Sequence, residues 1–116
     1  MLLPTIFWLA YILDEKVLVW DAQNLKVLLD SSDVHKPFKI SFSPNGHFFA
    51  CVAENGKLHI WKKSPTGYLS YQVFQSSAAE STPNFSPDGG SVISSSGNVL
   101  ELWHTASSPS PPPVFL

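Results

Sequence analysis

Hydrophobic and polar positions alternate with a period of two in three short segments that each end in tryptophan. These segments cover residues 17–20, 58–61 and 100–103. The residues one and three positions before each Trp are aliphatic, whereas the residue two positions before it varies: Leu18, His59 and Glu101. Since successive side chains of a strand point to opposite faces, the pattern predicts three β-strands, each with one strictly buried face. No helical periodicity competes with it.

The three tryptophans are spaced by 41 and 42 residues: Trp20, Trp61 and Trp103. A turn motif recurs in phase with them, as Phe-Ser-Pro-Asn-Gly ending at Gly46 and Phe-Ser-Pro-Asp-Gly ending at Gly89. Pro44 and Pro87 supply the φ that a type I turn needs, and the glycines accommodate a positive φ. Each copy therefore predicts a tight reversal between two antiparallel strands.

The second repeat is the fullest and predicts four strands, at 38–42, 48–53, 57–61 and 69–74. Such a meander is apolar on both faces, so it needs a neighbour on each side. The first repeat lacks a clear first strand, because its segment 8–13 is already the second. The third repeat lacks a clear last strand, because prolines follow His104. We therefore expect roughly two and a half sheets, where closed radial arrangements take about four to eight.

These features resemble WD40 repeats, in which a Phe-Ser-Pro-Asp-Gly turn precedes a strand, a turn and a strand ending in Trp-Asp, here Trp20-Asp21. The period also fits the roughly 40–45 residues of one such repeat. The resemblance implies an all-β fold of antiparallel four-stranded blades, forming an open or incomplete β-propeller. It covers nearly everything from Trp8 to His104, and residues 1–104 are assigned to one propeller domain with repeats at about 7–30, 38–74 and 82–104. The Ser/Pro-rich residues 105–116 are expected to form a flexible tail.

WD40 blades often carry a hydrogen-bonded tetrad of a turn Asp, a His, a strand Ser or Thr, and the Trp. The resemblance places Asp14 at the turn position of the first repeat, but Asn55 and a glycine at the other two. Cys51 stands where the strand hydroxyl is expected, Ser94 fills that place in the third repeat, and His35 lies closer to the turn than usual. No complete tetrad is expected, so the repeats are degenerate. The residues with an assigned structural role are Trp20, Asp21, Trp61, Trp103, Asp14, Pro44, Gly46, Pro87, Asp88 and Gly89.

Composition narrows the function classes. Hydrophobic residues make up 44% and charged residues 14%, which is too apolar for a disordered chain. The net charge is −2 and the basic residues are all lysine, which argues against nucleic acid as a partner.

The apolar segment 1–13 has no preceding basic residue and is shorter than the roughly 20 residues of a spanning helix, so we expect a buried strand and no membrane association. The single cysteine, Cys51, is expected to be a small buried hydrophobe, and it indicates a reducing compartment, cytoplasmic or alternatively nuclear.

No residue set has the spacing of a catalytic or metal site, so we expect no enzyme activity, no metal and no cofactor. The four histidines show no zinc spacing, and no Gly-rich phosphate loop is present. The alternative of a propeller enzyme or redox module would need titratable residues along the central channel of the propeller. The strand predicted to line that channel, 38–42, instead offers Phe38, Lys39, Ile40 and Phe42.

Loops on a rigid scaffold usually carry recognition. The turns at 14–16 and 54–56 and the connections at 30–37 and 75–83 are expected to gather on one face. The candidate protein-binding residues are Glu15, Lys16, His35, Lys36, Glu54 and Asn55. The sequence therefore favours a non-catalytic protein-interaction scaffold whose partners are other proteins, further propeller blades or another copy of the chain. The main alternative is a truncated fragment without independent function.

Overall fold

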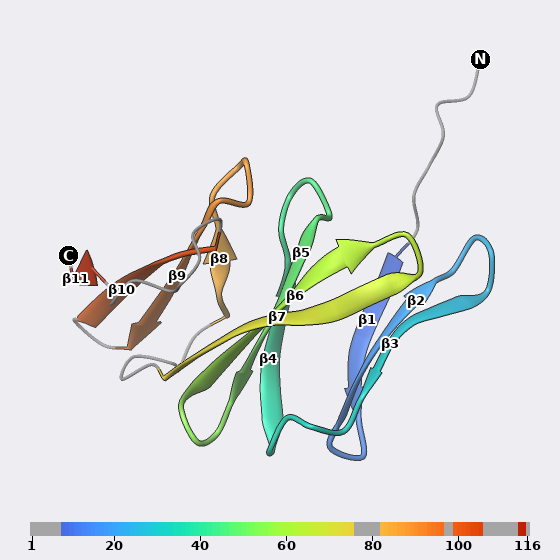
Figure 1. Ribbon diagram of the computed structural model, residues 1–116. Helices are drawn as coiled ribbons and strands as arrows, with labels where there is room; N and C mark the ends of the chain where they lie inside the picture. Colours follow the sequence, from blue (N-terminus) through green and yellow to red (C-terminus); the bar gives the residue numbers. More distant parts are fainter. Residues whose placement is uncertain (1–7, 76–81, 97–98, 106–113, 116) are drawn as a thin grey trace.

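The computed structural model describes residues 8–75, 82–96, 99–105 and 114–115, and its regular elements are all β-strands in three antiparallel sheets (Figure 1). The first sheet contains β1 (Trp8–Leu13), β2 (Lys16–Asp21) and β3 (Lys26–Ser31). The second contains β4 (Pro37–Phe42), β5 (Phe48–Ala53), β6 (Lys57–Ser64) and β7 (Gly67–Gln75). The third contains β8 (Asn84–Phe85), β9 (Ser91–Ser96), β10 (Val99–His104) and β11 (Val114–Phe115). The predicted all-β class is confirmed.

Each sheet is a meander, because strands that follow one another in the chain pair as neighbours. The three sheets lie side by side in chain order, and we call this arrangement of three sheets the fan (Figure 1). β1 contacts β4 and β3 contacts β7, so the first and second sheets lie face to face along their length. The predicted stacking of sheets that are apolar on both sides is therefore observed.

The β4–β5 turn owes its shape to the Ser-Pro-Asn-Gly motif. Gly46 N donates to Ser43 O at 2.9 Å, which closes the turn, and Gly46 has a φ of 75°. Ser43 Oγ accepts from Phe48 N at 2.9 Å and donates to Asn45 Oδ1 at 2.7 Å. Because the side chains supply partners for backbone groups that the reversal leaves unpaired, the motif specifies this turn locally.

The β8–β9 turn repeats this construction. Gly89 N donates to Ser86 O at 2.9 Å, and Ser91 N donates to Ser86 Oγ at 3.1 Å. Asp88 takes the place of Asn45, since its Oδ1 accepts from Ser86 Oγ at 2.7 Å and from Gly90 N at 2.8 Å. The predicted reversals at both copies of the motif are confirmed.

These hydrogen bonds hold the pKa of Asp88 below its ordinary value of 3.8, chiefly through Gly90 N and then through Ser86 Oγ. A carboxyl whose pKa is lower in the folded than in the unfolded state contributes stability that is complete above the unfolded pKa. That contribution is lost as the pH falls through the folded pKa. Asp21 behaves in the same way, chiefly because the Asn24 side chain donates to it.

We expect Asp88→Asn to fold at neutral pH and to lose part of this acid sensitivity. Asn45 already makes the corresponding contacts without a charge in the neighbouring turn. Urea unfolding between about pH 5 and pH 2 should show a shallower fall in the free energy of unfolding for Asp88→Asn than for the unsubstituted chain. Glu15→Gln, which removes an exposed carboxylate from another turn, is the control expected to keep the original slope. An unchanged slope for Asp88→Asn would contradict the assignment.

Two core clusters lie between the three sheets, one at each interface. In an antiparallel pair, cross-strand partners point to the same side, so the partners Phe49 and Trp61 share one side of the second sheet. We call this the Trp side of a sheet and the opposite side its aliphatic side. The first core cluster joins Phe49, Cys51 and Trp61 to the buried residues Val17 and Val19 of the first sheet. The Trp side of the second sheet therefore packs on the aliphatic side of the first.

The second core cluster has the same construction one sheet further along. It joins Val92 and Trp103, on the Trp side of the third sheet, to Ala50, Leu58 and Ile60 on the aliphatic side of the second. All six residues of β5 are buried, because β5 is covered from both sides. The chain thus contains two copies of one kind of interface, formed by successive repeats.

Several predicted boundaries are wrong. β6 does not end at Trp61 but continues to Ser64, and β7 begins at Gly67, so most of the loop expected at 62–68 is a continuous ladder closed by the pair Ser64 and Gly67. A register shift between Ile60 and Trp61 interrupts this ladder. The corresponding shift between Val19 and Trp20 occurs in the first sheet. Such bulges increase the local twist of a strand pair.

The third sheet extends further than the sequence indicated. Val114 and Phe115 pair with Leu102 and Glu101, which gives this sheet a short fourth strand. Thr105, assigned to the tail, is fully buried; its N donates to Gly90 O at 2.9 Å and its hydroxyl donates to Gly89 O. The remainder of the predicted tail, residues 106–113 and 116, lies outside the described residues.

The strand predicted in the apolar segment at the start of the chain is confirmed from Trp8 onward as β1, and residues 1–7 lie outside the described residues. The expectation that this strand is buried is wrong, because its residues are half-buried or exposed and Leu9 and Leu13 are each 55% exposed. Within the described residues, no helix has the length and hydropathy needed to cross a membrane.

Candidate functional site

Three connecting segments meet at one end of the fan, which we call the loop end. They are the β1–β2 turn at 14–16, the β3–β4 connection at 32–36 and the β5–β6 turn at 54–56. Figure 1 shows them along one edge, opposite the β2–β3, β4–β5 and β6–β7 turns. The expectation that these segments gather on one face agrees with this arrangement, and the β7–β8 connection falls largely outside the described residues.

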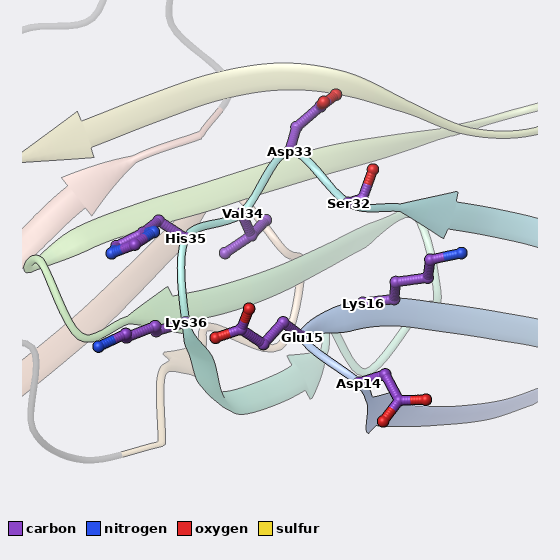
Figure 2. A pocket seen from close by; sticks show the side chains of 8 residues that line it. All are labelled: Asp14, Glu15, Lys16, Ser32, Asp33, Val34, His35 and Lys36. Atoms are coloured by element: carbon purple, nitrogen blue, oxygen red, sulfur yellow. The ribbon is translucent and has the colours of Figure 1, made fainter.

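A depression of about 340 Å³ lies between the first two of these segments (Figure 2). Its lining residues are Asp14, Glu15, Lys16, Ser32, Asp33, Val34, His35 and Lys36. Four of the six predicted binding residues, Glu15, Lys16, His35 and Lys36, are therefore brought to one surface. The sequence did not single out Ser32, Asp33 or Val34, although all three fall inside the predicted connection.

The backbone of this site is held in an unusual conformation. Asp14, Glu15 and Lys36 have φ values of 50°, 63° and 51°. Positive φ at two successive residues is the signature of the tight reversal that best matches strand twist. A residue with a Cβ pays about 1–2 kcal/mol for the left-handed region. Such conformations concentrate at functional sites, where surrounding structure enforces them.

The β3–β4 connection is fixed from beneath. Val34 is only 2% exposed and belongs to the first core cluster, and Pro37, which follows the connection, is buried. Asp33 N donates to Ser31 Oγ at 3.3 Å. Burial of Val34 leaves the polar residues on either side of it facing solvent, so the connection presents side chains from a rigid base.

The β5–β6 turn joins the same surface through Glu54. Glu54 N donates to Lys36 O at 3.1 Å, and Lys36 Nζ lies 3.8 Å from Glu54 Oε2. These side chains are 53% and 60% exposed, so the ion pair contributes about 0–1 kcal/mol and the backbone bond does more to fix the geometry. Asn55 shapes its own turn, because its Oδ1 accepts from Lys57 N at 3.1 Å and its O accepts from Gln75 Nε2 at 3.0 Å.

The chemistry of the loop end is that of a mixed-charge surface. The depression carries three carboxylates, two lysines and one histidine. Within the part of the chain that the structure describes, no group of three or more His, Cys, Asp or Glu residues could hold a metal ion. The arrangement offers hydrogen-bond donors and acceptors of both charges on rigid turns, which suits recognition of a polar surface.

Two titratable groups near the core have shifted pKa values. Burial raises the pKa of the Cys51 thiol to about 12, which keeps the thiol protonated at neutral pH. Burial also lowers the pKa of His59, with a further contribution from Lys57 and an opposing one from Asp33. The His59 ring stacks on Trp61 at 5.9 Å between centroids. Both residues therefore act as neutral packing groups.

The opposite end of the fan carries a second depression, of about 290 Å³. It is lined by Trp8, Phe42, Ser43, Pro44, Asn45 and Gly46. Of the residues assigned to the turn motif, Pro44 and Gly46 lie here, while Pro87, Asp88 and Gly89 form the β8–β9 turn beside it. Asn45 Nδ2 links the two turns by donating to Asp88 O at 3.0 Å.

Comparison with solved structures identifies the architecture. KlAtg21, in its complex with the coiled coil of AgAtg16, superposes with a TM-score of 0.64 at 14% identity, over 85% of this chain. The β-propeller domain of Myceliophteria thermophila Cps50 (Swd1) superposes with a TM-score of 0.62 at 13% identity, also over 85% of this chain. The chain folds as three blades of a β-propeller.

The chain spans 36% and 34% of the lengths of those two proteins. No protein-family model and no curated protein sequence matches it. The comparisons thus establish the propeller fold, and membership of the WD40 family stays a prediction from the sequence motifs.

The strand register shows which side chains bond the repeat tryptophans in place of the tetrad. In each blade, the residue two positions after the cross-strand partner of the repeat Trp is equivalent: Tyr11 on β1, Cys51 on β5 and Ser94 on β9. Trp103 Nε1 donates to Ser94 Oγ at 3.4 Å, as the resemblance implied for Ser94. Trp20 Nε1 donates to Tyr11 Oη at 2.9 Å, a role for Tyr11 that the sequence did not suggest.

The other residues that the resemblance placed at tetrad positions lie elsewhere. Asp14 and His35 are both exposed and border the loop-end depression. Asp21 instead closes the β2–β3 turn, where its Oδ1 accepts from Gln23 N at 3.1 Å and from Asn24 N at 3.2 Å. The Trp-Asp dipeptide therefore serves two separate purposes here: the indole bonds Tyr11 across the strand pair, and the carboxylate shapes the turn that follows.

Proposed function

We propose that the chain is a non-catalytic propeller scaffold that binds another protein through its loop end. One observation carries this proposal: Glu15, Lys16, His35 and Lys36 come from two separate segments of the chain and border one depression. Glu54 joins them through its contact with Lys36. Segments that are far apart in the sequence but share a rigid, polar surface are typical of recognition sites on propellers and other scaffolds.

The polar character of the loop end defines the kind of partner. Three carboxylates and two lysines line the depression, so a complementary surface carries charges of both signs. Exposed charge pairs of this kind contribute more to association rate and specificity than to affinity. Binding is therefore proposed to weaken as ionic strength rises. A cytoplasmic or nuclear location belongs to the same proposal.

The test uses the complete chain, immobilised as bait, with two charge-reversal variants. Lys16→Glu/Lys36→Glu alters the loop end. Lys26→Glu/Lys62→Glu makes the same change in net charge on exposed lysines elsewhere in the first two blades. We expect a protein partner that is captured saturably by the unsubstituted chain and by the control variant, and at least tenfold less by the loop-end variant.

Two results would overturn the proposal. One is that folded bait captures no protein saturably; the other is that both variants retain the partner equally. A cooperative melt monitored by circular dichroism must accompany each bait, because absence of a cooperative transition would support the alternative of a fragment without independent function.

A further inference from the structure

The two interfaces inside the chain are copies of each other. At each one, the Trp side of a blade packs on the aliphatic side of the blade before it. On the strands that carry the repeat Trp, the equivalent aliphatic residues are Val17 and Val19 on β2 and Leu58 and Ile60 on β6. All four are at most 1% exposed. The repeat Trp that covers them is buried in both cases, because Trp61 and Trp103 are each 4% exposed.

The same repeat positions are uncovered at the two outer faces of the fan. On the third blade, Leu100 and Leu102 occupy the positions of Leu58 and Ile60, but Leu100 is 39% exposed and Leu102 is half-buried. Ile93, which pairs with Leu102, points to the same side and is also half-buried. This aliphatic side has no blade on it within the described residues.

The second uncovered outer face is the Trp side of the first blade, which is the kind of surface that packs on an aliphatic side. Leu9 pairs with Trp20 and Tyr11 pairs with Leu18, so these four side chains share one side of the sheet. Leu9 is 55% exposed, and the other three are half-buried. Val27 of β3, which pairs with Trp20 of β2, adds a further apolar side chain that is 41% exposed. Contiguous apolar surface of this kind marks an interface.

We infer that these two outer faces bind each other between two copies of the chain, so that two chains close one propeller of six blades. The Trp side of the first blade of each copy packs on the aliphatic side of the third blade of the other copy. This packing occurs twice inside the chain, and the ring contains two such contacts between the copies. Two copies bring six blades, which lies within the roughly four to eight of closed propellers, whereas three copies would bring nine.

A second copy fits these faces better than an unrelated protein, because a copy supplies both missing halves at once. An unrelated protein on either face would leave the other one uncovered. The contact is head to tail, since different surfaces meet, and a head-to-tail contact gives a closed ring only when the rotation closes. The inference is independent of the loop-end proposal, because the two outer faces lie on the sheets and not on the loops.

The test measures the mass of the purified chain in solution by sedimentation equilibrium at micromolar concentrations. We expect twice the mass of one chain. Leu9→Asp and Leu100→Asp each place a charge in both contacts of the ring and should reduce the mass to that of a single chain. Leu69→Asp is the matched control, because Leu69 is 60% exposed on β7 of the middle blade and touches neither outer face. This variant should keep the doubled mass.

An equimolar mixture of the two single variants provides the decisive measurement. In a mixed ring, one contact carries both aspartates and the other carries none, so the mixture should regain the doubled mass at tenfold or more lower concentration than either variant alone. A contact between two like faces would behave differently: one variant would have no effect, and mixing would restore nothing.

Three results would overturn the inference. The first is that the unsubstituted chain has the mass of one chain at micromolar concentrations. The second is that only one of the two single variants changes the mass, and the third is that the chain forms open assemblies larger than two copies. Circular dichroism spectra of the single variants distinguish loss of the contact from loss of folding, and a folded variant with the mass of one chain is the expected result.

Discussion

Replacing Phe49 with alanine is expected to lower the free energy of unfolding by about 3–5 kcal/mol, the largest effect of any single truncation considered for this chain. Phe49 is fully buried in the first core cluster. Its ring centroid lies 4.9 Å from that of Phe42, 5.6 Å from that of Trp61 and 6.0 Å from that of Tyr68. The truncation removes dispersion contacts with three aromatic rings and leaves a cavity that rigid β-strands close only in part.

Urea unfolding followed by tryptophan fluorescence measures this loss, at one fixed protein concentration so that association does not change the apparent stability. Phe38→Ala is the matched control, because it removes the same side chain from a site that is 37% exposed. The control should cost about 1–2 kcal/mol, in proportion to the smaller area that Phe38 buries. Equal losses for the two variants would contradict the position of Phe49 between the first two blades.

Gly46→Ala is expected to cost about 2–5 kcal/mol, and Gly89→Ala about 1–2 kcal/mol, although both glycines occupy the same position of the same turn motif. Their φ values are 75° and 74°, so both substitutions force an alanine into the left-handed region. Their surroundings differ. A Cβ at Gly46 would overlap Cζ3 of Trp8 and come within 2.7 Å of Cη2, whereas a Cβ at Gly89 would meet Phe48 Cδ2 at 3.1 Å.

The ring of Trp8 has little freedom to move away from such a Cβ. Its centroid lies 6.0 Å from that of Phe42 and 6.1 Å from that of Tyr68, and Tyr68 Oη donates to Gly46 O at 2.6 Å. The double variant Trp8→Ala/Gly46→Ala removes the overlap and separates it from the cost of the backbone conformation. Urea unfolding of these three variants and of the unsubstituted chain gives the comparison. If Gly46→Ala cost no more than Gly89→Ala, the close approach of Trp8 to this turn would be excluded.

Local sequence features predicted the strands and turns well where one short segment contains all the necessary information. The predicted turns on either side located β5, with its bounds at Phe48 and Ala53. The Ser-Pro-Asn-Gly motif specified the turn before this strand, because Ser43 and Asn45 bond their own neighbours. The prediction failed where pairing extends a strand beyond its pattern, as it does from Trp61 to Ser64.

The loop end could be predicted only in part. The turn at 14–16 and the connection at 30–37 were recognisable as loops from composition and position, so their residues were predicted as candidates. The contact of Glu54 with Lys36 lies one position beyond the pair Pro37 and Ala53, so it continues the β4–β5 pairing of the second blade. Such proximity depends on the register between two strands, which neither segment encodes by itself.

The sequence by itself determined that this chain forms a series of antiparallel sheets, each with a tryptophan on one side and aliphatic residues on the other, because side-chain alternation and turn chemistry are local. The tertiary structure decided which of these sides are covered. Trp61 and Trp103 are buried and Trp20 is half-buried, although all three occupy the same place in the repeat. The physical reason is that burial of a sheet face requires a neighbouring sheet, and only the arrangement of the blades in space provides one.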